Sequence, residues 1–282
     1  MQAVFCFQTL IFAECWKGWY NGKKCHGICF AKLRPFTAAV CFFFNTLFRF
    51  RLDRSRTSAM ALTAADNCRN INMENFNQKN IVIYKDDISE DFFEWVSQIK
   101  IVGWDIETSG LDWKKEKIGT CQLYAPNKPP VIVKIGKTIP KNLCSLLADE
   151  SVKKIFYYAI FDLSFMASHW NADPKNIACT KTAIKLLDPK HVKKHSLANL
   201  LKERLGIIID KSEQCSNWFS AKLTEKQKEY AVKDAIYLLP LLNKLEAELK
   251  AQGLLELAHQ CFAHIPTRVQ LGLKGYKDVY DY

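Results

Sequence analysis

The sequence of 282 residues lacks the glycine-rich loops with which many proteins hold the phosphates of a nucleotide. Gly103, Gly110 and Gly119 fit neither the dinucleotide-binding fingerprint nor the phosphate loop of nucleoside triphosphatases. Internal repeats and low-complexity tracts are absent as well. Hydrolysis of nucleoside triphosphates and a bound small-molecule cofactor are therefore not expected.

The cysteines form no regular framework. There are 11 of them, an odd number, and no Cys-x-x-Cys pair occurs. A disulfide-bonded secreted fold is therefore not expected, and a reducing compartment, the cytoplasm, is predicted. Cys25, His26 and Cys29 resemble half of a zinc site, but no second ligand pair follows at zinc-finger spacing.

Long apolar runs are also missing. The most apolar run, residues 36–48, is shorter than the roughly 20 residues that cross a bilayer, so no membrane partner is expected. It lies far from Met1 and leads into arginines, unlike a secretory signal. Residues 1–72 are therefore interpreted as a poorly defined extension, rich in Cys and Phe, with a true start at Met60 or Met73 favoured. A transit peptide and a membrane tether stay open as alternatives.

Charge of one sign dominates. The formal net charge is +11 and the pI is near 9, which favours a polyanionic partner such as nucleic acid. Residues 1–72 contain ten Lys and Arg against three acidic residues, so this quarter supplies +7 and the remainder +4. The domain that follows is only mildly basic, and charge supports a nucleic-acid partner without deciding it.

Residues 73–282 are predicted to form one α/β domain. Strands are expected at 81–84, 101–106, 118–124, 131–135 and 154–157. Helices are expected at 89–98, 161–170, 180–187, 196–205 and from Thr224 to Gly253, with a kink at Pro240. The prolines at 126–130 indicate a hairpin, so three strands form an antiparallel meander, and the next strand–helix unit adds a parallel strand to a mixed sheet.

Four carboxylates and a tyrosine occupy key positions in this pattern. Asp105 and Glu107 share a face of an apolar strand, and Tyr230 and Asp234 share a face of a helix. Asp162 lies between apolar residues, where an unpaired acid is disfavoured as a structural residue. Asp105, Glu107, Asp162 and Asp234 are therefore predicted to hold two divalent cations, Mg²⁺ or Mn²⁺, with Tyr230 orienting the attacking water.

These residues carry a resemblance to a known family. The motifs 105–108 (Asp-Ile-Glu-Thr), 159–163 (Ala-Ile-Phe-Asp-Leu) and 230–234 (Tyr-Ala-Val-Lys-Asp) resemble those of the DEDD 3′-5′ exonucleases, in the tyrosine subgroup, and ribonuclease D in particular. The resemblance covers residues 81–282. It implies a ribonuclease H-like fold with a mixed five-stranded sheet and helices on both faces.

The resemblance also implies substrate contacts. Thr108 and Leu111 would contact the terminal nucleotide, with Leu111 as an apolar wedge. Many relatives carry His and Asn where this chain has Tyr157 and Tyr158, so contacts there are expected to differ. The short tail is similar to short bacterial forms that lack the C-terminal helical domains of longer ribonuclease D proteins.

A basic loop adds one candidate from the residues alone. His195, with nearby cations, precedes a helix that begins near Ser196, where backbone amides favour an anion, so a phosphate contact is predicted; a solvated loop is the equal alternative.

The function predicted is metal-dependent 3′-5′ hydrolysis of single-stranded RNA ends to nucleoside 5′-monophosphates. A DNA exonuclease of the proofreading or repair type is the alternative, because recognition of the 2′-hydroxyl cannot be read from these motifs. A catalytically silent nucleic-acid-binding adaptor is a third hypothesis, although all four carboxylates are retained. The sequence leaves the oligomeric state open.

Overall fold

The fold is described from a computed structural model that places residues 80–191, 195–210, 212–213, 216–277 and 279. The predicted extension, residues 1–72, and the half zinc site in it lie outside the described residues. The lysines of the basic loop, Lys193 and Lys194, lie outside them too.

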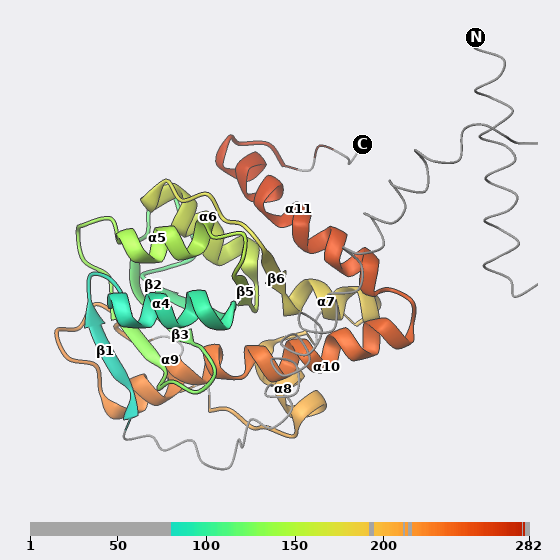
Figure 1. The fold of residues 1–282 in the computed structure, drawn as a ribbon, viewed down its shortest axis with the longest axis horizontal. Coiled ribbons are helices and arrows are strands. Elements are labelled where there is room, and N and C mark those ends of the chain that lie inside the picture. Colours follow the sequence, from blue (N-terminus) through green and yellow to red (C-terminus); the bar gives the residue numbers. More distant parts are fainter. Residues whose placement is uncertain (1–79, 192–194, 211, 214–215, 278, 280–282) are drawn as a thin grey trace, which may run out of the picture. The chain divides into compact units, whose positions relative to one another are not determined.

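A mixed sheet of six strands forms the centre of the domain (Figure 1). Its strands, in chain order, are β1 (Val82–Lys85), β2 (Ile101–Thr108), β3 (Ile118–Tyr124), β4 (Val131–Lys134), β5 (Lys153–Phe156) and β6 (Ile177–Cys179). Their order across the sheet is β1-β4-β3-β2-β5-β6. β2, β3 and β4 form the expected antiparallel meander, and β5 joins β2 in parallel as expected.

The expected count of five strands was one short. The additional strand, β6, pairs with β5 in parallel and forms one edge of the sheet. It contains only Ile177, Ala178 and Cys179, which is too short a run to show an alternation of apolar and polar residues. Pairing with β5 and packing against helices hold β6 in the sheet. No alternation of apolar and polar residues in its sequence marks it as a strand.

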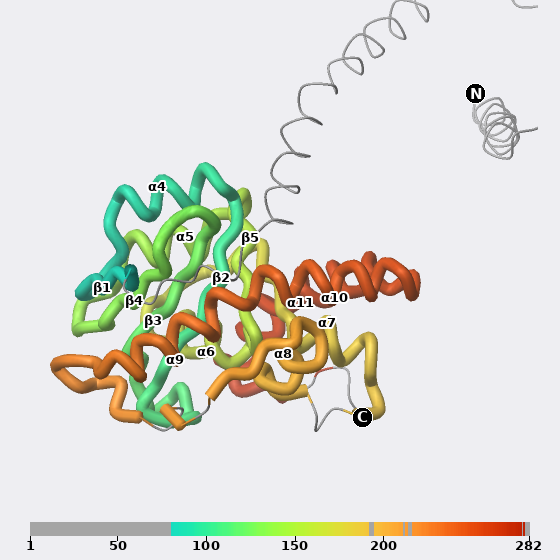
Figure 2. The backbone as a smooth tube through the Cα atoms, turned by 90° about the horizontal axis from the view of Figure 1, so that it is seen from below, coloured from blue at the N-terminus to red at the C-terminus, as the bar shows by residue number. Residues whose placement is uncertain are grey.

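Helices lie on both faces of the sheet, as predicted. They are α4 (Glu90–Ile99), α5 (Lys141–Ala148), α6 (Ala159–Trp170), α7 (Thr180–Leu187), α8 (Leu197–Leu205), α9 (Glu225–Ile236), α10 (Leu238–Ala251) and α11 (Leu255–Leu273). Figure 2 shows α4 and α5 on one side of β2 and β3, with α9 and α10 on the other. The layers are thus helix, sheet, helix.

Local sequence signals set several helix ends. Ser89 and Ser196 cap α4 and α8 by accepting hydrogen bonds from backbone amides in the first turn. Gly206 ends α8 with a left-handed backbone (φ 70°), which glycine adopts without strain. Gly253, also left-handed (φ 71°), lies just beyond α10.

The kink expected at Pro240 is a break between two helices. α9 ends at Ile236 and α10 begins at Leu238, so the break lies at Tyr237. A proline ring clashes with the carbonyl of the residue four positions earlier, which here is Ile236. The disruption therefore falls one turn before the proline, and Pro240 itself sits in the first turn of α10.

The main apolar core lies between the sheet and its helices, with Trp104 and Phe156 among its largest fully buried side chains. Trp104 and Phe156 stack with ring centroids 5.9 Å apart, which joins β2 to β5. Within the part of the chain that the structure describes, no helix is both long and apolar enough to cross a membrane.

Candidate active site

Strand β2 presents two carboxylates on one face. Val102, Trp104 and Ile106 are buried on the opposite face, so the alternation of a strand directs Asp105 and Glu107 the other way. Asp105 lies opposite Gln122 of β3 and Glu107 opposite Thr120. The carboxylate face of β2 therefore continues onto β3.

Helix α9 packs tightly against this face because residue 103 is glycine. A Cβ atom on Gly103 would lie 2.4 Å from the carbonyl oxygen of Ala235 on α9, closer than real contacts allow. The neighbour of Ala235 in sequence is Asp234, whose side chain is 9% exposed. The missing side chain at 103 therefore allows α9 to bring Asp234 up to β2.

The start of α9 is fixed by a reciprocal cap. The Thr224 hydroxyl accepts a hydrogen bond from the Gln227 amide (3.1 Å), and the Gln227 side chain accepts one from the Thr224 amide (2.9 Å). Gln227 also donates to the carbonyl of Asn217 at 3.4 Å, so the helix start is tied to the preceding loop. Because the start of α9 is fixed, the directions in which Tyr230 and Asp234 project from the helix are fixed as well.

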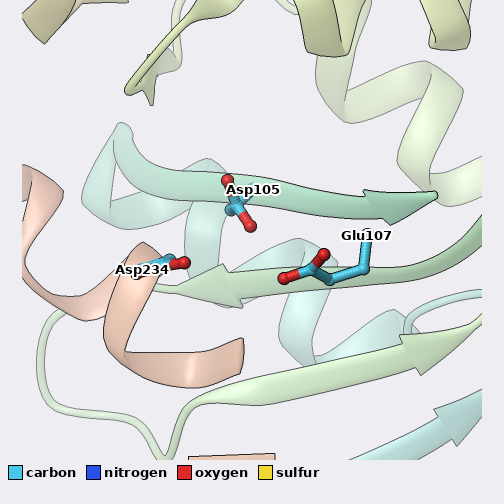
Figure 3. A group of neighbouring side chains, drawn as sticks. All are labelled: Asp105, Glu107 and Asp234. Atoms are coloured by element: carbon cyan, nitrogen blue, oxygen red, sulfur yellow. The ribbon is translucent and has the colours of Figure 1, made fainter. Parts of the chain in front are cut away.

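Three carboxylates meet where β2 and α9 approach. Asp105, Glu107 and Asp234 each offer a carboxylate oxygen, and these oxygens lie within 4.8 Å of one another. In Figure 3 the Glu107 and Asp234 carboxylates point toward one another, with Asp105 beside them on β2. This spacing suits oxygen ligands of a shared hard cation.

A fourth carboxylate and a tyrosine line the same cavity. Asp162, in the first turn of α6, is 4% exposed, and the cavity of about 490 Å³ is lined by Asp105, Glu107, Asp162, Tyr230 and Asp234. All five residues predicted from the motifs thus gather at one cavity. They come from β2, α6 and α9, which are far apart in the sequence.

The electrostatics of the cluster are those of crowded, partly dehydrated acids. Burial raises the pKa of Asp105 well above its ordinary value, and the charges of Asp162, Asp234 and Glu107 raise it further. Burial followed by the charges of Asp234 and Asp162 raises the pKa of Glu107. Burial also raises the pKa of Asp162. A divalent cation beside these acids would oppose their mutual repulsion and favour their ionised forms.

Tyr230 keeps its proton in this setting. Burial, and then the charges of Asp234 and Glu107, raise the pKa of its phenol. Its ring contacts Trp218, with centroids 6.0 Å apart, and Trp218 is 2% exposed. The phenol is therefore a positioned neutral hydroxyl and not a base.

Comparison with known proteins places this arrangement in a family. A sequence profile described as 3′-5′ exonuclease matches residues 80–250, more than half of the chain. The chain belongs to the 3′-5′ exonuclease family. Ribonuclease D of Escherichia coli (strain K12) is a similar curated protein, 28% identical over 177 residues that cover 63% of this chain and 47% of that protein. The chain spans about half the length of the curated relatives it matches, or less.

Solved structures of 3′-5′ exonucleases share the fold. Brucella melitensis NrnC matches with a TM-score of 0.66 and 30% identity, over 72% of this chain and 99% of that chain. Structures of NrnC with bound Mg²⁺ and with pGG match with TM-scores of 0.65. E. coli ribonuclease D matches with a TM-score of 0.60 at 24% identity. The predicted ribonuclease H-like exonuclease fold is confirmed.

The three predicted substrate contacts of this exonuclease domain lie in different settings. Leu111 lines the cavity and is 84% exposed. Thr108 follows the acidic pair on β2 but is not among the residues that line the cavity, and its hydroxyl donates to the carbonyl of Gly110 at 2.6 Å. His195 is 4% exposed and is likewise not among them; its Nε2 lies 3.5 Å from an Asp188 carboxylate oxygen.

Several residues at the exonuclease site were not singled out from the sequence as its lining. Besides the acids, Tyr230 and Leu111, the cavity is lined by Ile106, Phe161, Ser196, Leu197, Ala198 and Ile209. Tyr157 and Tyr158, where substrate contacts were expected to differ from those of relatives, line it too. Next to the acids, Thr120 and Gln122 are fully buried, and Gln122 Nε2 donates to Thr120 Oγ1 at 2.6 Å. Two polar residues within the apolar strand β3 are a signal that could have identified that pair.

Proposed function

We propose that this protein is a metal-dependent 3′-5′ exoribonuclease that hydrolyses single-stranded RNA ends to nucleoside 5′-monophosphates. The observation that carries the proposal is the convergence of Asp105, Glu107 and Asp234 within 4.8 Å at a cavity also lined by Asp162 and Tyr230. Names of relatives support RNA as the substrate: ribonuclease D among curated proteins, and an E. coli ribonuclease D described as an exoribonuclease of structured RNA processing.

The residues fit a pair of hard divalent cations. The cavity is lined by four carboxylates and by no Lys, Arg or His among the described residues, so nothing in its wall neutralises the cluster. Asp105, Glu107, Asp162 and Asp234 would hold Mg²⁺ or Mn²⁺, which prefer oxygen ligands. When bound, such ions supply a water of lowered pKa and neutralise charge on the leaving oxygen.

The chain's own groups orient the reactants. Tyr230 Oη, which keeps its proton and lies one helical turn from Asp234, would hydrogen-bond an attacking water. Leu111, exposed at the mouth of the cavity, would press on the last bases of the strand. Because the cavity is partly shielded from water, interactions between charges inside it are stronger than in bulk solvent.

Digestion of matched labelled strands tests the proposal. Purified protein with MgCl₂ should shorten single-stranded RNA stepwise from its 3′ end and release nucleoside 5′-monophosphates, while the same RNA blocked by a 3′-phosphate should be shortened more slowly. Asp105→Asn should reduce kcat at least 100-fold. Faster digestion of the matched DNA would favour the DNA exonuclease, and binding of RNA without cleavage would favour the adaptor.

We propose the cytoplasm as its compartment. Cys121, Cys144, Cys179 and Cys261, all within the described part of the chain, are free thiols, which suits a reducing environment. Fractionation of cells that make the full-length protein checks this, and recovery with membranes would contradict it.

A further inference from the structure

We propose that Tyr158 is a stacking platform for a base of the substrate strand and that Lys181 fixes its ring in position. The inference rests on the proposed nuclease function and names a substrate contact within that site. Tyr158 lines the cavity that contains the four carboxylates and is 39% exposed. A partly exposed aromatic ring in a cavity wall gains contact energy when a second flat ring stacks on it.

A lysine ammonium group lies over the ring of Tyr158. Nζ of Lys181 lies 4.2 Å from the ring centroid of Tyr158 and 5.3 Å from that of Tyr157. Lys181 is not among the residues that line the cavity. The cation that contacts the ring is therefore not part of the cavity wall, whereas the partly exposed Tyr158 is.

The backbone of Lys181 is fixed next to the two tyrosines. It lies in the first turn of α7, and its backbone amide donates to the carbonyl of Tyr157 at 3.0 Å. It forms no ion pair with any residue of the described part of the chain, and burial lowers the pKa of its ammonium group. A partly dehydrated cation without a carboxylate partner has the two tyrosine rings as its contacts.

The two tyrosines differ in the use of their hydroxyl groups. The Tyr157 hydroxyl donates to the carbonyl of His195, which ties the ring to the loop before α8. The Tyr158 hydroxyl makes no hydrogen bond with any residue that the structure describes. A purely structural role accounts for Tyr157 but explains neither the 39% exposure of Tyr158 within the cavity wall nor its hydroxyl without a described partner.

Stacking on a ring is tolerant of base identity because every base has a flat π face. Tyr158 should therefore add affinity without selecting a sequence. It should also make the enzyme sensitive to a strand that lacks a base at the contacted position. This sensitivity is the property that separates stacking from a general structural effect.

Steady-state kinetics of the full-length protein on single-stranded RNA test the platform. Tyr158→Ala should raise KM about tenfold or more, equivalent to about 1.4 kcal/mol, with kcat changed less than twofold. Tyr158→Phe keeps the ring and should stay within twofold of wild type. Tyr276→Ala, which removes a 58% exposed tyrosine that does not line the cavity, is the matched control and should change neither constant.

Substrates with one abasic nucleotide, at the last or the next-to-last position, give the decisive comparison. The difference between wild type and Tyr158→Ala should disappear on one of them, which identifies the contacted base. A penalty that persists on both, or no penalty on intact RNA, overturns the platform. Should Tyr158→Ala fail to fold, wild type alone suffices: 2-aminopurine at one of those two positions should lose fluorescence on binding, and unchanged fluorescence at both overturns the platform.

KM values of Lys181 variants test whether Lys181 acts through the ring of Tyr158. Lys181→Met should raise KM severalfold, Lys181→Arg should restore it, and Lys181→Met should add nothing to Tyr158→Ala. Additive penalties would show that Lys181 acts independently of the ring. Failure of wild type to shorten any RNA would overturn the proposed function, whereas shortening that ignores Tyr158 would overturn the platform alone.

Discussion

At the scale of single residues, the site is a cluster of like charges that opposes folding when no cation is present. Each carboxylate pair at about 4 Å costs on the order of 1 kcal/mol even at the dielectric of water. The raised pKa values of Asp105, Glu107 and Asp162 express this cost, together with that of burial. Removal of one of these carboxylates is therefore expected to stabilise the metal-free protein and to weaken metal binding.

Asp105→Asn should stabilise the metal-free protein. Removal of about 1 kcal/mol of repulsion corresponds to a rise in Tm of about 2–4 °C in a chelator. The same change should abolish most of the rise in Tm that MgCl₂ gives wild type, because a ligand is lost. Thermal melts with EDTA and with MgCl₂ measure both effects.

Asp149→Asn is a control for the Asp105→Asn prediction, because the pKa of Asp149 is lowered and that of Asp105 is raised. The Asp149 carboxylate accepts hydrogen bonds from the amide and hydroxyl of Ser151 at 2.7 and 2.6 Å, which hold its pKa below the ordinary value. This variant should lower Tm and leave the response to MgCl₂ intact. Equal Tm changes for the two variants would contradict the repulsion argument.

Lys154→Met should remove a pH-dependent cost. Lys154 is fully buried on β5 and burial lowers its pKa to about 8 from 10.5. The native chain thus loses this proton near pH 8, whereas the unfolded chain keeps it until about pH 10.5, so wild-type stability rises with pH across that window. At pH 7 the variant should be more stable by about 1–3 kcal/mol, and this advantage should vanish by pH 10.5.

Urea unfolding at pH 7 and at pH 10.5 measures the Lys154 effect. Nζ of Lys154 donates to the carbonyl of Asp149 at 2.6 Å, but that carbonyl also accepts from the Val152 amide at 3.3 Å, so it keeps a partner in the variant. Lys185→Met, an exposed change on α7, is the control and should follow wild type. A variant that loses stability at pH 7 would show that the hydrogen bond outweighs the burial cost.

At the scale of elements, the close approach of α9 to β2 sets the geometry of the site. Gly103→Ala should move α9 away, because its Cβ would lie 2.4 Å from a backbone oxygen that cannot rotate aside. The expected loss is about 1–3 kcal/mol of stability. Activity at saturating Mg²⁺ should also fall, since Asp234 moves with α9.

Gly272→Ala supplies the matched control for the α9 displacement. A Cβ there meets only the end of the Arg268 side chain, at 3.8 Å, and Gly272 lies within α11. This change should leave activity unchanged and raise stability by about 0.5–1 kcal/mol. Unfolding midpoints and kcat of both variants test this prediction. A Gly103→Ala protein with wild-type kcat would contradict the role of the close approach between Gly103 and Ala235.

The elements also show where prediction from sequence stops. Strands with an apolar run, such as β2, and helices with a capping signal, such as α9, were predicted within a few residues. β6, α5 and α11 were not, because β6 has three residues, α5 follows Pro140 with two turns, and α11 contains Pro266. Their positions depend on packing against the rest of the domain.

The site divides in the same way. The acids and Tyr230 were found because strand and helix periods place them on common faces. The buried position of His195 was not predicted, since it depends on the loop before α8 and on the side chain of Asp188, 3.5 Å from His195 Nε2. Tyr158 was named from the sequence as a position of altered substrate contact, but its contact with Lys181 was not predicted, because no local spacing encodes it.

At the scale of the whole molecule, the sequence interpretation treats residues 1–72 as an extension of the domain that residues 73–282 form. On that interpretation, a protein that starts at Met73 should fold with a Tm within about 2 °C of the full-length chain and with an equal kcat. Because residues 1–72 contribute +7 of the net +11, it should also bind RNA with a weaker dependence on salt wherever those cations contact phosphates.

Thermal melts, together with RNA affinity measured across a range of salt concentrations, check this prediction. Each phosphate contact with a single strand contributes a slope of about −0.7 to the plot of log K against log salt. An unchanged slope would mean that the first 72 residues make no contact with RNA, and the domain alone then carries binding. A fall in Tm well beyond 2 °C would instead mean that part of the core comes from residues before Met73, which would move the domain boundary toward Met1.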